Sequence, residues 1–389
     1  MNTLNGKWNY PTTVFFGAGI AADIAQHCGE LGIQQPLLVT DRGLAEHGVV
    51  VSLKKTLDDA RLPCAIFADI KPNPVGENIT AGVEAFRQHQ ADGIVAVGGG
   101  SALDAAKAIA LMVAQSRPLW DFEDCGDNWS RVNPDGMAPL IALPTTSGTG
   151  SEVGRASVIT HEEAHRKVII FHPEMLPDRV LADPALTCGL PAALTAATGM
   201  DALSHNLEAY CAPGFHPMAD GIALEGIRLV HKALPLAVQN GEDIEARSLM
   251  MAASTMGATA FQKGLGGIHA LAHPLGAVYD AHHGLLNAIL MPYVLIANRE
   301  VLDSKMTRLA RYLNLTQPGF DAVLHWILDL RKQINIPNSL ELADIHVDDP
   351  VKIANMAIDD PSAGGNPIVL SVDDYTRILE DAMTGRLAV

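Results

Sequence analysis

The sequence predicts two domains, an N-terminal α/β domain with a parallel sheet followed by an all-helical C-terminal domain. Three observations lead to this prediction. A chain of 389 residues is too long for one ordinary hydrophobic core. Short apolar runs alternate with helical patterns in the first half, as they do in βαβ units. From Pro191 onward, long amphipathic helical patterns replace these runs. We place the boundary near residue 185, which predicts domains at 1–185 and 186–389.

The individual elements follow from the periodicity of the apolar residues. Strands are expected at residues 13–16, 36–40, 64–67, 93–97 and 140–143, and two further β-rich stretches lie at 167–171 and 179–182. Helical patterns in the first half include 20–31, 77–89 and 102–114. In the second half they include 219–234, 244–261 and 285–297.

The charge and the cysteines exclude several classes of function. Forty-four acidic and 27 basic residues give a formal net charge of −17, which disfavours nucleic acids and anionic lipid surfaces as partners. We find no signal peptide and no apolar run that approaches about 18 residues. The five cysteines contain no C-x-x-C pair, as is typical of reduced thiols in the cytoplasm. A small anionic cofactor remains compatible, because backbone N–H groups can bind phosphate.

Two glycine-rich loops compete for the phosphates of a nucleotide. The first, residues 17–22, fits G-x-G-x-x-A, and Asp41 follows at the end of the next predicted strand. This resembles a dinucleotide fingerprint, but it also fits a plain strand-to-helix turn. The second loop, Gly98-Gly99-Gly100-Ser101, leaves a strand and runs directly into a helix that carries Asp104. Its glycines allow close approach of a phosphate to the helix N-terminus, so we favour this loop as the binding site.

A third loop and Asp41 bear on the same cofactor. Residues 144–152, PTTSGTGSE, follow a predicted strand and are rich in hydroxyl groups and glycine. They fit either a helix start capped by Thr149 or Ser151 or a ligand contact at the carboxyl end of the sheet. A carboxylate at Asp41 can accept hydrogen bonds from ribose hydroxyls and would repel a 2′-phosphate, which favours NAD over NADP.

Two stretches of the helical half carry candidate metal ligands. Asp201 and His205 are four residues apart, which places both side chains on one helix face. This pair fits a divalent metal or a local hydrogen bond equally well. His269 and His273 have the same spacing, and His282 and His283 follow before the next helical pattern. Four histidines in an apolar segment are costly to bury without partners, so this cluster indicates a functional site.

The donors are carboxylate and imidazole groups without a thiolate. This excludes the cysteine-rich type of structural zinc site. It fits Fe²⁺, or a catalytic Zn²⁺ with an open position for a substrate oxygen. Spacing alone does not decide which of the histidines bind the ion.

At these positions the sequence resembles the iron-containing (group III) alcohol dehydrogenases. The stretch DPALTCGLPAALTAATGMDALSHNLE, residues 183–208, looks like the signature of that family. GGGSALDAAKA, PTTSGTGSEV and HALAHPLGAVYDAHHG fit the family in the same order, and AGGNP at 363–367 resembles its closing loop. Together the matches span nearly the whole chain.

The resemblance implies an NAD-binding α/β domain and a helical metal-binding domain of dehydroquinate synthase-like architecture, with the active site in the cleft between them. It implies Asp201, His205, His269 and His283 as metal ligands and His273 as a catalytic proton-relay residue beside the substrate. It implies that the pyrophosphate of the cofactor binds at Gly98, Gly99, Gly100 and Ser101, and Asp104 is assigned to the same site. It implies that Asp41 binds the adenosine ribose and that Lys167 lies near the nicotinamide ribose. Further cofactor contacts are implied for Thr145, Thr146 and Thr149. The loop at 17–22 then becomes a structural turn.

One departure concerns the last ligand. Many family members carry proline before it, whereas this chain has His282. We prefer His283, because it keeps the family's spacing from His269 and the glycine that follows. Ser362 occupies a variable position in the closing loop and is expected to line the substrate pocket.

The function that the resemblance implies is hydride transfer between a primary alcohol or small diol and NAD, with Fe²⁺ or Zn²⁺ as the metal. A homodimer or larger homo-oligomer is expected on the same ground. A zinc-type glycerol or polyol dehydrogenase is the nearest alternative. A dehydroquinate synthase-like lyase would need basic residues around the metal, and segments 198–210 and 264–287 contain neither Lys nor Arg. A non-enzymatic NAD-binding protein would leave the Asp and His set without a role.

Overall fold

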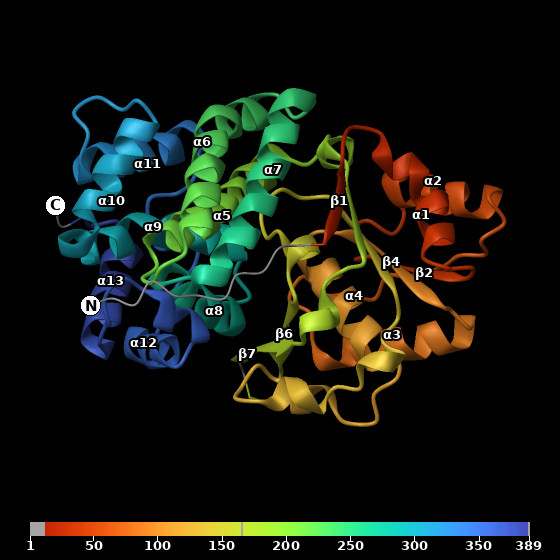
Figure 1. The fold of residues 1–389 in the computed structure, drawn as a ribbon. Coiled ribbons are helices and arrows are strands. Elements are labelled where there is room, and N and C mark those ends of the chain that lie inside the picture. The colour runs from red at the N-terminus through yellow and green to blue at the C-terminus, as the bar shows by residue number, and fades with distance from the viewer. Residues whose placement is uncertain (1–11, 165, 388–389) are drawn as a thin grey trace. The chain divides into compact units, whose positions relative to one another are not determined.

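The computed structural model describes residues 12–164 and 166–387. The chain forms two compact units, which are coloured along the sequence in Figure 1. The sheet unit contains the described residues as far as Thr146 together with Gly150–Cys188. The helical unit contains Ser147–Thr149 and the chain from Gly189 onward. The predicted α/β half with a parallel sheet and the predicted helical half are both confirmed.

The sheet unit is built on a six-stranded parallel sheet with the order β1-β8-β5-β4-β2-β3. The strands are β1 (Thr13–Phe16), β2 (Pro36–Val39), β3 (Ala65–Phe67), β4 (Gly93–Gly98), β5 (Leu140–Pro144) and β8 (Arg179–Ala182). The chain moves from β2 outward to β3, but from β4 in the opposite direction to β5. The strand order therefore reverses between β2 and β4, and ligands bind at the carboxyl ends of the strands at such a point.

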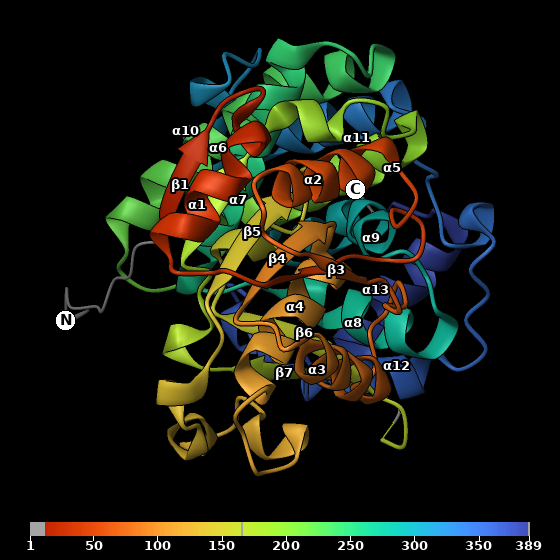
Figure 2. The same ribbon diagram turned by 90° about the vertical axis from the view of Figure 1, so that its right-hand side faces the viewer.

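Helices cover both faces of this sheet because its central strands are apolar at every position, as buried parallel strands are. Leu38, Val95 and Ile141 pack against α1 (Ile24–Glu30) and α2 (Gly48–Asp59). Their sequence neighbours, such as Leu37 and Ile94, face α3 (Gly76–His89) and α4 (Gly100–Met112). Figure 2 shows the two helical layers with the sheet between them.

Two elements of the sheet unit were not singled out from the sequence. These are helix α2 and strand β6 (Ala156–His161). Strand β6 pairs antiparallel with β7 (Arg166–Phe171) in a separate two-stranded sheet. The buried Lys107 of α4 secures the segment that leads into β6. Its ammonium group donates to the carbonyls of Ser151, Gly154 and Ala156.

The helical unit contains nine α-helices among the described residues. They are α5 (Ala192–Cys211), α6 (Pro217–Gln239), α7 (Ile244–Ala260), α8 (Gly267–Tyr279), α9 (His283–Ala297), α10 (Arg299–Tyr312), α11 (Phe320–Gln333), α12 (Pro350–Ile358) and α13 (Val372–Thr384). Helix α5 is buried along most of its length and packs against α6, α7 and α9, as Figure 1 shows. Polar side chains on α5 therefore need partners inside the unit.

Among the residues that the structure describes, no single helix has the length and apolar character to cross a membrane, although α9 and α10 pass that test together as a pair bent by 112°.

Candidate metal centre and cofactor-binding loops

Three helices of the helical unit bring the predicted metal ligands together. Asp201 and His205 lie one turn apart on α5, His269 lies near the start of α8, and His283 is the first residue of α9. The start of α9 approaches α5 closely because residue 284 is glycine. A Cβ atom at Gly284 would lie only 2.5 Å from the carbonyl oxygen of Ala197.

The ligand atoms of Asp201, His205 and His269 lie within 4.8 Å of one another, and His283 Nε2 lies near the Asp201 carboxylate. Asp201 Oδ1 lies 3.7 Å from His283 Nε2 and 4.0 Å from the Nε2 atoms of both His205 and His269. Two ligands that each lie about 2.1 Å from one ion are separated by at most about 4.2 Å. The three distances meet this condition, and Asp201, His205 and His269 form a buried group that could hold a metal ion. One carboxylate and three imidazoles therefore fit a divalent cation such as Fe²⁺ or Zn²⁺.

The environment of His205 prepares its imidazole for metal binding. Burial lowers the pKa of His205 to about 4, so the ring is neutral near pH 7 and keeps a free lone pair. Its Nδ1 lies 3.2 Å from the carbonyl oxygen of Gly148. Because a carbonyl only accepts hydrogen bonds, Nδ1 carries the proton and Nε2 is left for the ion.

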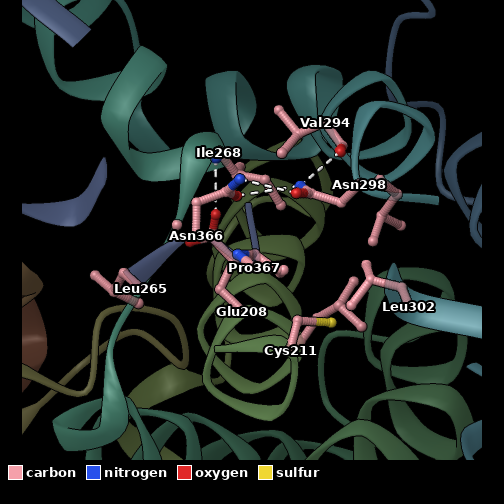
Figure 3. Close-up of a pocket in the computed structure, with 12 residues that line it drawn as sticks. Glu208, Cys211, Leu265, Ile268, Val294, Asn298, Leu302, Asn366 and Pro367 are labelled. Atoms are coloured by element: carbon pink, nitrogen blue, oxygen red, sulfur yellow. Dashed lines mark hydrogen bonds between the residues drawn. The ribbon is translucent and has the colours of Figure 1, made fainter. Parts of the chain in front are cut away.

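Glu208 orients the imidazole of His269 by engaging its Nδ1. One oxygen of the Glu208 carboxylate accepts a hydrogen bond from His269 Nδ1 and the other accepts from the backbone N–H of Ile268, at 2.7 Å. Burial alone would lower the pKa of His269, but the Glu208 carboxylate outweighs it and the pKa lies above its usual value. Figure 3 shows Glu208 beside Ile268 at the start of α8, with Asn298 and Asn366 nearby. This carboxylate therefore caps α8 and orients a ligand at the same time.

Asn287 is a further residue at the centre, and the sequence analysis did not identify it. Its side-chain amide nitrogen lies 2.8 Å from Asp201 Oδ1 and 3.1 Å from the Nε2 atoms of His269 and His283. It lies one helical turn after His283 on α9, so the i, i+4 spacing was the signal available in the sequence.

The two neighbouring histidines at the start of α9 have different partners. His282 is the N-cap residue of the helix, and its Nδ1 accepts a hydrogen bond from the backbone N–H of Leu285 at 3.3 Å. His283 instead turns its Nε2 toward Asp201 and Asn287. Of the two histidines, His283 is thus the one whose Nε2 lies near the Asp201 carboxylate, and its role as a ligand stays a prediction.

His273 lies beside this group. Its ring stacks on the His283 ring with centroids 5.4 Å apart and meets the His269 ring edge-on at 5.8 Å. Its Nδ1 is hydrogen-bonded to Asp360 Oδ2 at 2.8 Å. His273 therefore lies adjacent to His269 and His283, with its Nδ1 engaged by Asp360.

In the sheet unit, the two glycine loops differ in what occupies their N–H groups. In the first loop the backbone N–H groups of Gly19 and Ala21 both donate to the carboxylate of Asp183, at 3.0 and 3.1 Å. The donors that would bind a phosphate are therefore satisfied by a side chain, as in a structural turn. The second loop leads into α4, whose N-cap residue Gly99 makes no side-chain capping bond in the described part of the chain. Its first N–H groups are available to an anion.

The second loop also lies at the point where the strand order reverses. Gly98 ends β4 with a φ of 153°, a conformation that favours glycine. A Cβ atom at Gly98 would lie 2.6 Å from the Cβ of Ala102 and 3.5 Å from Asp41 Oδ2. Asp41, which follows β2, thus lies against the glycine loop. Its other oxygen accepts hydrogen bonds from the backbone N–H groups of Gly43 and Leu44.

The remaining predicted cofactor residues have varied surroundings. The N–H of Thr145 donates to the Gly98 carbonyl at 3.0 Å, and the Thr146 side chain would lie 3.4 Å from a Cβ at Gly99. Ser101 Oγ donates to the Pro72 carbonyl. The Asp104 carboxylate accepts hydrogen bonds from the Ser151 hydroxyl and the Val158 N–H. Lys167 lies on β7 in the sheet unit, and Thr149 belongs to the helical unit.

Comparison with known proteins agrees with these two units. A sequence model described as iron-containing alcohol dehydrogenase matches residues 11–184, and one described as Fe-containing alcohol dehydrogenase family, C-terminal, matches residues 195–383. The chain belongs to the iron-containing alcohol dehydrogenase family. Within this family it is 38% identical to the 4-hydroxybutyrate dehydrogenase of Cupriavidus necator, over 96% of this chain and 99% of that protein.

Two solved structures are similar to this chain in fold. A 1,3-propanediol oxidoreductase superimposes with a TM-score of 0.92 at 35% identity and covers 97% of this chain and 100% of its own. A sulfoacetaldehyde reductase from Bifidobacterium kashiwanohense, solved in complex with NAD+, superimposes with a TM-score of 0.87 at 28% identity, over 97% and 99% of the two chains.

The contact between Glu208 and His269 generates a prediction for metal affinity. In Glu208→Gln, an amide NH₂ facing His269 would make Nδ1 an acceptor and move the proton to Nε2, the atom needed by the ion. We expect metal affinity to fall by about 10- to 100-fold, measured by competition with a chelator. Glu225→Gln, whose carboxylate pairs with Arg228 on α6, is the matched control. Unchanged affinity in Glu208→Gln would contradict the assignment.

Proposed function

We propose that this protein is a metal-dependent alcohol dehydrogenase and aldehyde reductase that transfers hydride between a primary alcohol or small diol and NAD. The observation that carries the proposal is the convergence of the Asp201 carboxylate and three imidazoles, with ligand atoms 3.7 to 4.0 Å from Asp201 Oδ1. A carboxylate grouped with several imidazoles is a donor set that suits a divalent cation. Family membership supplies the reaction class.

In the proposal the ion is held by Asp201, His205, His269 and His283. When bound, a divalent ion supplies Lewis acidity toward the oxygen of an alcohol or carbonyl group. The proposed ligands themselves contribute one carboxylate charge and three imidazoles. Gly148 and Glu208 hold His205 and His269 in the tautomer that this role needs. The proposal names Fe²⁺ from the family and keeps Zn²⁺ as the alternative that the same donors accept.

The cofactor in the proposal is NAD, which accepts the hydride in alcohol oxidation. Gly98, Gly99, Gly100 and Ser101 would bind its pyrophosphate at the open N-terminus of α4. Asp41, placed against that loop, would accept hydrogen bonds from ribose hydroxyls and disfavour the 2′-phosphate of NADP. We assign further cofactor contacts to Thr145, Thr146, Thr149 and Lys167. We also assign Asp104 to this site, because its carboxylate accepts a hydrogen bond from the hydroxyl of Ser151, which belongs to the third loop.

His273 is proposed as the residue that moves the hydroxyl proton of the alcohol. Oxidation of an alcohol releases one hydride and one proton, so a residue beside the metal must handle the proton. His273 lies next to two ligands, and its Nδ1 is engaged by Asp360. Nε2 is therefore the nitrogen proposed for proton transfer.

The substrate class follows from the relatives. The similar proteins carry names of enzymes that act on 4-hydroxybutyrate and on 1,3-propanediol, both of which present a primary hydroxyl group. We propose a small primary alcohol or diol for this chain as well. A phosphorylated sugar-acid substrate is disfavoured, since Lys263, the basic residue just before α8, is already paired with Asp220.

Location and assembly remain predictions. We propose a cytoplasmic location, consistent with five free cysteines, of which Cys28, Cys64 and Cys211 are buried. A homodimer or larger homo-oligomer is proposed from the family resemblance. Light scattering of the purified protein would measure the assembly.

The proposed function is tested by NADH production from a panel of primary alcohols, diols and polyols, after metal removal and reloading. We expect turnover to require the metal, to appear with Fe²⁺ or Zn²⁺, and to be faster with NAD than with NADP. Parallel assays of aldehyde reduction test the reverse direction. Turnover that is equal in metal-free and loaded protein would contradict the proposal.

His273→Ala tests the proton-transfer role. We expect kcat to fall by about 10²- to 10⁴-fold, the usual contribution of a positioned acid or base, while the metal-to-protein ratio stays unchanged. His325→Ala, at an exposed position on α11, is the control. Loss of metal in His273→Ala would show that this residue acts as a ligand instead.

A further inference from the structure

The site contains a carboxylate that the reaction outlined above does not use. Asp360 lies between α12 and the short 3-10 segment Pro361–Gly365, and only 12% of its side chain is exposed. Its Oδ2 lies 2.8 Å from His273 Nδ1, and its Oδ1 accepts a hydrogen bond from the backbone N–H of Ser362 at 2.8 Å. A carboxylate removed from water needs such partners.

We propose that Asp360 is the positioning residue for His273, fixing both the orientation of its ring and the nitrogen that it presents to the substrate. This inference rests on the proposed function, in which His273 moves the proton of the alcohol. Asp360 itself touches neither the ligand atoms nor, in this proposal, the substrate.

The first support is the chemistry of the hydrogen bond. An ionised carboxylate can only accept, so His273 Nδ1 must carry the proton and Nε2 must be unprotonated in the neutral ring. Burial alone would raise the pKa of Asp360, but the His273 imidazole and the hydrogen bonds from His273 and Ser362 outweigh it. The pKa of the carboxyl therefore lies below its usual value, and Asp360 is ionised near pH 7.

The second support is the way the ring is held. Its plane lies only 13° from that of His283 and 65° from that of His269. Stacking against one ring and edge contact with the other restrict tilting, but neither contact distinguishes the two ring nitrogens. The bond to Asp360 is the interaction that does. It sets which edge of the ring turns away from the closing loop.

The third support is the rigidity of the segment that carries Asp360. Six residues later, Asn366 accepts a hydrogen bond from the N–H of Gly267 at 3.1 Å and exchanges hydrogen bonds with Asn298. These contacts attach the closing loop to the first residue of α8, the helix that carries His273. The carboxylate and the imidazole are thus fixed to the same helix, which is what positioning to within about 0.5 Å requires.

Asp360→Asn is the sharpest variant. If its side-chain oxygen keeps the bond from the Ser362 N–H, its NH₂ group faces His273 Nδ1. That nitrogen would become an acceptor, and the proton would move to Nε2. The variant thus preserves size and loop capping but reverses the tautomer. We expect kcat to fall about 10- to 100-fold, with unchanged metal content and melting temperature. Asp359→Asn, the exposed neighbour, is the matched control.

A double-mutant cycle separates positioning from a purely structural role. If Asp360 acts through His273, Asp360→Asn should change kcat by less than about twofold in a His273→Ala background, because the residue it positions is gone. A fall of the same size in both backgrounds would overturn the proposal, and so would an unchanged kcat in the single variant. Either result would leave the His273 role intact.

A measurement without turnover distinguishes this proposal from the proposed function. Proton–nitrogen spectra of Zn²⁺-loaded, ¹⁵N-histidine-labelled protein report which nitrogen of each imidazole is protonated, and His273→Ala assigns the signal. We expect protonated Nδ1 in the wild type and protonated Nε2 in Asp360→Asn. The same tautomer in both proteins would overturn the positioning role, whether or not any alcohol is oxidised.

Discussion

The structure of the helical unit depends on gathering one carboxylate and three imidazoles from three helices, with Asp201, His205 and His269 buried and His283 partly exposed. Asp201, His205 and His269 are almost completely inaccessible to solvent, and burying such groups costs free energy unless they are paired or bind a metal. Three helices must meet for the ligand atoms to come within 4.0 Å of Asp201 Oδ1. Gly284 allows the start of α9 to approach α5 closely, and α5 is buried along most of its length. A bound cation would therefore stabilise the fold as well as supply the chemistry.

The residues around the ligands come from segments far apart in the sequence, and each has a distinct task. Gly148 and Glu208 each engage the Nδ1 atom of a ligand histidine, and Asn287 holds the ligand carboxylate. Asp360 makes the equivalent contact with His273, for which we propose a role in proton transfer. Outer contacts of this type fix which ring nitrogen is unprotonated and how the ring is oriented, and both affect metal affinity.

Much of this architecture was predictable from the sequence, and most of the exceptions share a cause. The alternation of strands and helices, the Asp201 and His205 pair and the histidine cluster are local patterns. The second glycine loop was favoured from its own residues, but the contact that occupies the first loop depends on Asp183, which lies 164 residues from Gly19 in the sequence. Glu208 and Asp360 were missed for the same reason, since their partners are tertiary, whereas Asn287 was missed although its i, i+4 spacing from His283 was a local signal. Strand β6 was also missed, and its contacts are tertiary, since it pairs with β7 and Ala156 accepts a hydrogen bond from the distant Lys107.

X-ray absorption at the iron edge of anaerobically loaded protein tests the central claim most directly. The account predicts only nitrogen and oxygen neighbours at about 2.0–2.2 Å, with the multiple-scattering signature of three imidazoles. One imidazole should be lost in His283→Ala and none in His282→Ala. A sulfur neighbour at about 2.3 Å, or loss of an imidazole in the His282 variant instead, would contradict the ligand set on which the rest of the account is built.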